Sequence, residues 1–178
     1  KIYGEFIAQH HPEEKIVILQ QNDEFGRSFM GGIEEGLGDK FSNIVTIATY
    51  EATDPTIDSQ VINLHETGAT VFLDLSTPKF AAQAIRKVAD LGWKPTHIVP
   101  TAAASVSQVM VPAGIDNAQG VITAAYLKDP TDPRWEDDAG MNEFRAFMDE
   151  YVPQGNKSSV FGVIGYSGAG KSTLIRML

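Results

Sequence analysis

The stretch Thr70-Val71-Phe72-Leu73-Asp74-Leu75, followed by Phe80-Ala81-Ala82-Gln83-Ala84-Ile85-Arg86-Lys87-Val88-Ala89-Asp90-Leu91, places a short apolar run directly ahead of an amphipathic one. The first run has the length and apolar content of a strand buried on both faces. In the second, apolar side chains at positions 81, 84, 85, 88 and 91 repeat at helical spacing, and Gly92 follows as a stop signal. A strand followed by a helix is the repeating unit of a parallel α/β sheet.

The same alternation extends outward in both directions from this unit. The predicted strands cover residues 15–19, 44–49, 70–75, 96–100, 121–126 and 159–165. The predicted helices cover residues 2–9, 26–37, 56–67, 79–91, 141–151 and 169–177. A turn is expected at 112–114 and a rigid surface loop at 129–133, because proline and glycine gather there. The sequence thus predicts an α/β fold of three layers: a doubly wound, mostly parallel, flavodoxin-like sheet of order 2-1-3-4-5, with a sixth strand beside the fifth.

Composition excludes several classes of function. Fourteen basic against twenty-three acidic residues give the 178-residue chain a formal charge of −9, which disfavours nucleic acid as a partner. The absence of cysteine excludes a disulfide framework and a thiolate nucleophile. No apolar run approaches the roughly 20 residues that span a bilayer, so we expect no membrane insertion. The chain opens at Lys1 without a signal peptide, which predicts a soluble chain that is cytoplasmic as expressed.

The most specific motif lies near the end of the chain, where residues 165–172 fit G-x-x-x-x-G-K-[ST], the phosphate-binding P-loop. Its backbone N–H groups and Lys171 would hold a phosphate or the phosphates of ATP, Thr173 would assist at the helix start, and Ser172 would coordinate Mg²⁺ with the nucleotide. We expect no cofactor to be required for folding. The predicted phosphate-site residues are Gly165, Ser167, Gly168, Ala169, Gly170, Lys171, Ser172 and Thr173. Alternatively, the segment forms a continuous helix, or the loop stays empty; the β-branched residues and Gly162 in 160–164 favour strand, loop and helix.

The residues around this motif argue against catalysis. A P-loop ATPase also needs a carboxylate on a neighbouring strand, and Asp74 would lie three strands away, roughly 14 Å at about 4.8 Å per strand. Asp74 is interpreted as a cleft or strand-end residue. Ser167 lies in a near match to a nucleophile elbow, but no histidine follows it. The four histidines do not pair at zinc-ligand spacing and are interpreted as surface or capping residues. We therefore expect a binding protein without enzyme activity.

Four segments resemble the second lobe of type I periplasmic solute-binding proteins of the branched-chain amino acid ABC importers. These segments are residues 16–26, 50–60, 77–83 and 124–133. The resemblance covers residues 1–157 and implies a periplasmic parent lobe that holds a small molecule at the carboxyl ends of its strands. The solute-contacting residues that it implies are Asn22, Asp23, Phe25, Ser76, Thr77, Thr101 and Ala102. The alternative for these positions is ordinary loop chemistry, since Asn22 and Asp23 precede a helix and the segment Ser76 to Pro78 is typical of a helix start.

The last part of the chain departs from that family. Residues 160–176 resemble the first strand, P-loop and helix of an ABC-transporter ATPase of the methionine-importer type. The two resemblances together imply a chimera, engineered from a solute-binding lobe (1–157) and a strand–P-loop–helix segment (158–178) that completes the same domain. Residues 155–159 form the expected seam.

Three functions remain open at this point. The chain is predicted to be a chimeric binding domain whose P-loop takes phosphate or ATP without efficient hydrolysis. Alternatively, it is a solute-binding lobe for a small carboxylate or amino acid with an inert P-loop, or an ATPase fragment that needs a partner. A lobe without its partner lobe can leave an apolar patch uncovered, which leaves homodimer formation open as well.

Overall fold

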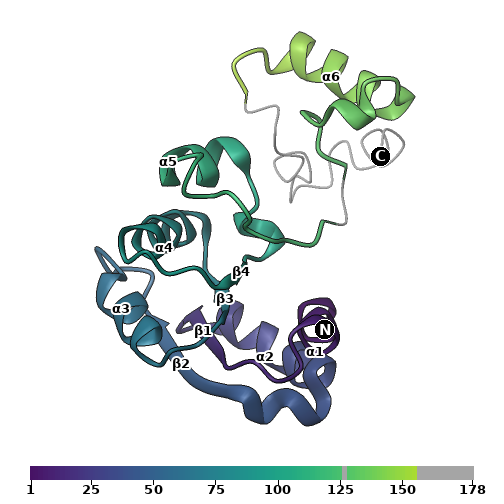
Figure 1. Ribbon diagram of the computed structural model, residues 1–178. Coiled ribbons are helices and arrows are strands. Elements are labelled where there is room, and N and C mark those ends of the chain that lie inside the picture. Colours follow the sequence, from purple (N-terminus) through teal and green to yellow (C-terminus); the bar gives the residue numbers. More distant parts are fainter. Residues whose placement is uncertain (126–127, 156–178) are drawn as a thin grey trace. The chain divides into compact units, whose positions relative to one another are not determined.

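A computed structural model of the chain describes residues 1–125 and 128–155, and divides them between two compact units, residues 1–124 and the part that follows residue 124 (Figure 1). The first unit contains one parallel sheet of order β2-β1-β3-β4. Its strands are β1 (Ile16–Gln21), β2 (Ile44–Tyr50), β3 (Val71–Leu75) and β4 (Thr96–Ile98). These four strands and their order confirm the prediction for this part of the sheet, and with it the α/β fold class.

Helices cover both faces of the sheet, as predicted (Figure 1). Helices α1 (Ile2–His10) and α2 (Glu24–Leu37) lie on one face, whereas α3 (Asp58–Glu66) and α4 (Pro78–Asp90) lie on the other. Strand side chains alternate between the two layers: Val17 and Leu19 pack with α3 and α4, and Ile16 and Ile18 pack with α1 and α2. All four of these side chains are fully buried, which explains why the β1 sequence is continuously apolar.

Glycines allow α1 and α2 to approach backbone to backbone. A Cβ atom added to Gly4 would lie 2.7 Å from the carbonyl oxygen of Ile33, and one added to Gly36 would lie 2.3 Å from the carbonyl oxygen of Lys1. Side chains at these positions would push the helices apart. The position of α1 against α2 therefore depends on residues that have no side chain.

The prediction of a fifth strand at residues 121–126 is wrong for the residues that the structure describes. Only an isolated bridge forms there, between Ile122 and Ile98. Ile122 N–H donates to the carbonyl of His97, and Val99 N–H donates to the carbonyl of Ile122, both at 2.9 Å. The partner strand β4 is only three residues long, since Pro100 has no N–H group to donate and the chain then turns into the 3-10 helix η2 (Thr101–Ala103). A strand needs a partner of its own length, and β4 does not provide one.

Residues 105–114 form more structure than the predicted turn. A π-helical turn, η3 (Val106–Met110), continues into α5 (Val111–Ala113) and ends at Gly114, whose φ is 94°. Ser105 caps this segment through a hydrogen bond from the Gln108 N–H to its hydroxyl, 3.3 Å long. Val109 and Ala113 become buried against the outer side of α4. Sequence alone did not predict this segment because its β-branched and proline residues disfavour a helix in isolation.

In the second unit, residues 128–155 contain the 3-10 helix η4 (Pro133–Trp135) and helix α6 (Ala139–Tyr151), which confirms the predicted last helix. Asp138 caps α6 by accepting a hydrogen bond of 3.0 Å from Met141 N–H. The loop at 129–133 is held by Arg145, which donates to the carbonyl oxygen of Pro130 at 2.8 Å. The predicted segment 158–178 lies outside the described residues. This segment contains the strand predicted at 159–165 and the helix predicted at 169–177.

The turn from β1 into α2 supplies the first testable prediction. A Cβ atom on Gly26 would lie 2.0 Å from the Gln21 carbonyl oxygen, whereas one on Gly31, in the same helix, meets nothing within 4 Å. Gly26→Ala should therefore lower the free energy of unfolding by on the order of 2 kcal/mol. Gly31→Ala should raise it by about 1 kcal/mol, because alanine favours the helix. Urea unfolding followed by circular dichroism measures both, and equal effects at the two positions would contradict the packing of this turn.

Candidate functional site

The carboxyl ends of β1, β2 and β3 meet at one edge of the sheet. Gln21, the last residue of β1, pairs in register with Tyr50, the last residue of β2, and β3 ends at Leu75. Because the strands are parallel, the loops that follow them begin at this edge, which is where open α/β sheets bind ligands. We call the hydrogen-bonded group formed there by Gln21, Asp23, Tyr50 and Thr77 the strand-end network.

Thr77, at the start of α4, connects the ends of β1 and β2. Its hydroxyl donates to Gln21 Oε1 at 3.3 Å, and its backbone N–H donates to the Tyr50 hydroxyl oxygen at 3.0 Å. Tyr50 is 2% exposed, and its ring lies 4.3 Å from that of Phe80, centroid to centroid. Burial raises the pKa of the Tyr50 phenol, so its hydroxyl stays neutral and can both donate and accept.

Asp23 brings a negative charge to the same network. Gln21 Nε2 donates to its carboxylate, and Asp23 also caps α2 by accepting a hydrogen bond of 3.2 Å from Gly26 N–H. The hydrogen bond from Gln21 is the main cause that holds the pKa of the Asp23 carboxyl below its usual value, and backbone N–H groups of Gly26 and Phe25 add to it. Asp23 is thus an ionised, half-exposed group at a helix N-terminus.

The other predicted residues of this edge take separate roles. Asn22 is exposed, and its side-chain amide donates to Glu51 Oε1 at 2.6 Å. Phe25 is half-buried on the first turn of α2, with its ring edge-on to Phe29 at 5.2 Å. Ser76 is fully buried, and its hydroxyl oxygen has no hydrogen-bond partner among the described residues.

Thr101 and Ala102 follow β4. The Thr101 hydroxyl donates to the carbonyl oxygen of Ala124, and Ala102 is exposed. Among the described residues, Thr101 thus belongs to a hydrogen-bonded group of its own. The structure brings Asp23 and Thr77 into one network with Asn22 beside it, and places Thr101 and Ala102 at the neighbouring strand end.

Sequence reasoning missed Gln21, Tyr50 and Glu51 as site residues. The available signal was positional: Gln21 and Tyr50 are polar residues that end otherwise apolar strands. The eight predicted phosphate-site residues, Gly165 to Thr173 with Lys171 among them, lie outside the described residues, so their geometry stays a prediction.

His97 differs from its interpretation, whereas Asp74 lies near the end of its strand as expected but is buried. His97 is only 5% exposed, so its assignment as a surface or capping residue is wrong. It lies opposite Phe72 in the β3–β4 register, stacks on that ring at 4.7 Å, and places Nε2 3.3 Å from Asp74 Oδ2. Asp74 is fully buried in β3 and forms part of the interior. Among residues 1–125 and 128–155, no three His, Asp or Glu side chains gather as a metal site.

The lowered pKa of Asp23 predicts an acid-sensitive contribution to stability. The unfolded carboxyl titrates near pH 4 and the folded one below it, so the unfolded chain binds more protons in this window and stability falls as pH falls through it. Asp23→Asn keeps a capping oxygen but cannot titrate. We expect the variant to be less stable than wild type at pH 6, and the difference to shrink below about pH 4.

Urea unfolding at pH 3, 4, 5 and 6 measures this difference. Other carboxyls with lowered pKa values, such as Asp58 and Asp138, are present in both proteins and cancel in the comparison. A difference that is constant across the series would contradict the assigned role of the Asp23 charge.

No described helix is long and apolar enough to cross a membrane. A comparison with curated protein sequences finds no match to this chain. Solved structures with the same fold include the following three, with TM-scores of 0.67 to 0.71 and identities between 15% and 22%.

One is a branched-chain amino acid ABC transporter protein from Thermus thermophilus with bound valine: 16% identity, TM-score 0.71, covering 85% of this chain and 38% of that one. Another is a solute-binding protein from R. palustris in complex with benzoate, with 15% identity, TM-score 0.67 and coverage of 83% and 39%. The third is an extracellular ligand-binding receptor from Verminephrobacter eiseniae, with 22% identity, TM-score 0.67 and coverage of 88% and 44%. The chain thus spans about two fifths of the length of these structures.

The family model for periplasmic binding proteins matches residues 2–170. This match includes the whole described sheet and both loops of the strand-end network, and it runs past residue 157, where the resemblance found in the sequence stops. The chain therefore belongs to the periplasmic binding protein family.

Proposed function

We propose that this chain is one lobe of an ABC-transporter solute-binding protein and that it binds a small molecule at the carboxyl edge of β1, β2 and β3. The observation that carries the proposal is the strand-end network, in which the last residues of β1 and β2, Gln21 and Tyr50, are joined by Thr77 at the start of α4. Membership of the periplasmic binding protein family supports the same location.

An amino acid suits the groups at this edge, because the ionised Asp23 would attract its ammonium group; a small carboxylate would have to bind away from Asp23, at the Asn22 amide and Phe25. Asp23 offers an ionised carboxylate, Asn22 an exposed amide, and Phe25 an apolar surface on the first turn of α2. The related structures from Thermus thermophilus and R. palustris hold valine and benzoate, which are molecules of this size. The proposed activity is binding without turnover.

The affinity of this chain alone should be low. A small ligand normally loses most of its surface to the walls of its pocket, and the chain spans about two fifths of its relatives. The strand-end network supplies one wall, and we propose that a second lobe supplies the other. Thr101 and Ala102, after β4, would extend the same wall.

Calorimetric titration with valine and with benzoate tests this proposal. We expect saturable, weak binding of at least one of them, because the groups of the network are preorganised. Phe25→Ala should remove the binding by deleting the apolar contact, whereas Lys171→Ala should leave it unchanged. Gly31→Ala on α2 is the matched control outside the network. Binding that survives Phe25→Ala, or that depends on Lys171, would contradict the proposed location.

A second candidate function comes from the P-loop motif. The sequence Gly165-Tyr166-Ser167-Gly168-Ala169-Gly170-Lys171-Ser172 is specific for phosphate binding, and we propose that it takes phosphate or ATP with Mg²⁺ without efficient hydrolysis. The family match reaches residue 170 and so includes the first six of these eight residues. Two alternatives to an origin within one family go with this motif. The chain would be an engineered chimera with an ATPase segment, or an ATPase fragment that needs a partner.

Titration with a fluorescent ATP analogue and Mg²⁺ separates these possibilities. If the P-loop is functional, binding saturates and Lys171→Ala abolishes it, while Phe25→Ala has no effect. Phosphate release above background that is lost in Lys171→Ala would support the ATPase fragment. A wild-type chain that binds no analogue would reject the phosphate site.

Other expectations also remain proposals. The parent lobe is expected in the periplasm by its family. A homodimer of this chain would form through the edge strand β2, where Val45 and Ile47 are 44% and 42% exposed.

A further inference from the structure

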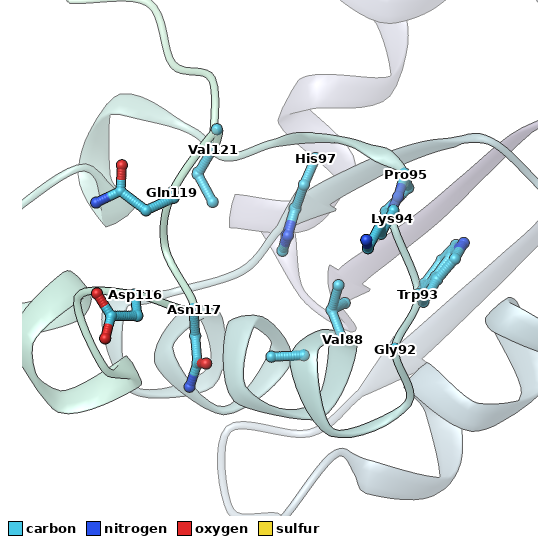
Figure 2. Close-up of a pocket in the computed structure, with 12 residues that line it drawn as sticks. Val88, Gly92, Trp93, Lys94, Pro95, His97, Asp116, Asn117, Gln119 and Val121 are labelled. Atoms are coloured by element: carbon cyan, nitrogen blue, oxygen red, sulfur yellow. The ribbon is translucent and has the colours of Figure 1, made fainter.

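Strand β2 is the open edge of the sheet. Within residues 1–125 and 128–155, β2 pairs with β1 alone, and Figure 1 shows it at the outer end of the sheet. The opposite edge is covered by the segment that leads to Ile122, which bonds to the backbone of His97 and Val99. Val121 of this segment and His97 of β4 line one cavity of about 470 Å³ there (Figure 2). A further strand is therefore accommodated at β2.

Hydrogen bonding along β2 shows which backbone groups face this open edge. The Tyr50 carbonyl oxygen accepts a hydrogen bond of 2.8 Å from the N–H of Asn22, the residue after β1, and so faces β1. Successive residues of a strand turn their N–H and C=O groups to alternate sides, so Thr49 turns its groups to the open edge. By the same alternation Ile47 does so too, and Val45 continues the row at the start of the strand.

The neighbouring side chains leave this row of backbone groups accessible. Gln60 Nε2 donates to the Thr49 carbonyl oxygen at 3.4 Å, and the Thr46 hydroxyl donates to the Val45 carbonyl oxygen at 2.7 Å. Each carbonyl oxygen has two lone pairs and can accept a second hydrogen bond. In the part of the chain that the structure describes, no side chain bonds to the backbone of Ile47. Ile47 is thus the centre of an accessible row.

The composition of β2 lacks the devices that usually keep edge strands from pairing. Natural edge strands often carry lysine, another charged residue or proline, which prevent pairing with a second chain. Residues 44–50 contain neither a charge nor a proline, and five of the seven are β-branched, which suits a strand. Val45 and Ile47 are 44% and 42% exposed, and Thr49 is exposed as well. A register shift against β1 is confined to the start of β2, so the rest is a regular edge.

We propose that this edge binds a second copy of the chain, through antiparallel pairing of two β2 strands about a twofold axis at Ile47. The axis places Ile47 beside Ile47 of the second copy, and Thr49 beside Val45 in both directions. Residues that turn their backbone groups outward then meet as hydrogen-bonded pairs, in which each residue donates and accepts. The paired side chains are all β-branched, and such pairs stabilise neighbouring strands.

A second copy fits this edge better than an unrelated strand because the row is complementary to itself. Val45 and Thr49 lie at equal spacing on either side of Ile47, so one rotation satisfies all three positions at once. Because the β4 edge is covered, pairing closes at two copies. The inference rests on the homodimer proposed above and adds the direction and register of its strands.

Charge opposes this pairing at long range but not at the contact. Each chain carries a formal charge of −9, so two copies repel each other, whereas residues 44–50 carry no charge. Salt screens the repulsion between exposed charges and leaves the backbone hydrogen bonds in place. Association should therefore strengthen when NaCl is raised from about 0.05 M to about 0.5 M.

Sedimentation equilibrium of the full chain from about 1 μM to about 1 mM measures the association, because a contact between two single strands is a weak interface. We expect a monomer–dimer equilibrium. Ile47→Lys should raise its dissociation constant at least about tenfold, because two lysines would meet at the axis. Ile115→Lys is the matched control: Ile115 is 46% exposed outside β2, and the variant should dimerise as wild type does. Circular dichroism verifies that both variants are folded.

Disulfide cross-linking tests the register, and the chain has no cysteine of its own. Opposite residues of a hydrogen-bonded pair have Cα atoms about 5.5 Å apart, within the range that a disulfide bridges. Oxidised Ile47→Cys should therefore give a covalent dimer. Val45→Cys, at a similarly exposed position, is the matched control. Its two thiols would lie roughly 13 Å apart along the strands and should stay unlinked.

The possible outcomes separate this register from the homodimer as such. A dimer that Ile47→Lys leaves intact, or equal cross-linking of the two cysteine variants, would overturn the β2 register while the homodimer itself stands. A wild-type chain that stays monomeric at about 1 mM would overturn both. The titrations with valine and benzoate probe the strand-end network, so a failure of solute binding would leave this inference standing.

Discussion

The parallel pairing of β1 with both β2 and β3 is the constraint on which the rest of the first unit depends. Ile16 to Leu19 are fully buried because both faces of β1 are covered by helices and both of its edges are paired. Parallel pairing brings the ends of β1, β2 and β3 to one edge, and it places the connecting helices on the two faces. The strand-end network exists only because Gln21 and Tyr50 arrive there in register.

Polar groups in this unit are concentrated on the face covered by α3 and α4. The Asp74–His97 pair lies within the sheet on that side, and the charge of Asp74 acts on Tyr50, which belongs to the strand-end network. The opposite face, covered by α1 and α2, is an apolar layer of aliphatic and aromatic side chains in which glycines permit close helix contact.

Local sequence patterns predicted four strands and five helices whose ends agree with the structure within one or two residues. This is because the spacing of apolar residues and the stop signals are properties of neighbouring residues. Predictions that depend on distant partners failed. Residues 121–125 have strand character but meet a β4 of three residues, ended by Pro100. Residues 106–113 lack helical propensity, yet burial of Val109 and Ala113 against α4 makes them helical. His97 looks like a surface histidine until Asp74 and Phe72 are placed beside it.

The sequence by itself determined the α/β class, the alternation of strands and helices, and the capping role of Asp23, since each depends on residues close together in the chain. It also marked Asn22, Asp23 and Thr77 as loop residues at strand ends. Tertiary folding was needed to bring Thr77 to Gln21 and Tyr50, and to bring one nitrogen of His97 to Asp74. Both outcomes join residues more than 20 positions apart, and the register of parallel strands, which no local pattern contains, sets those distances.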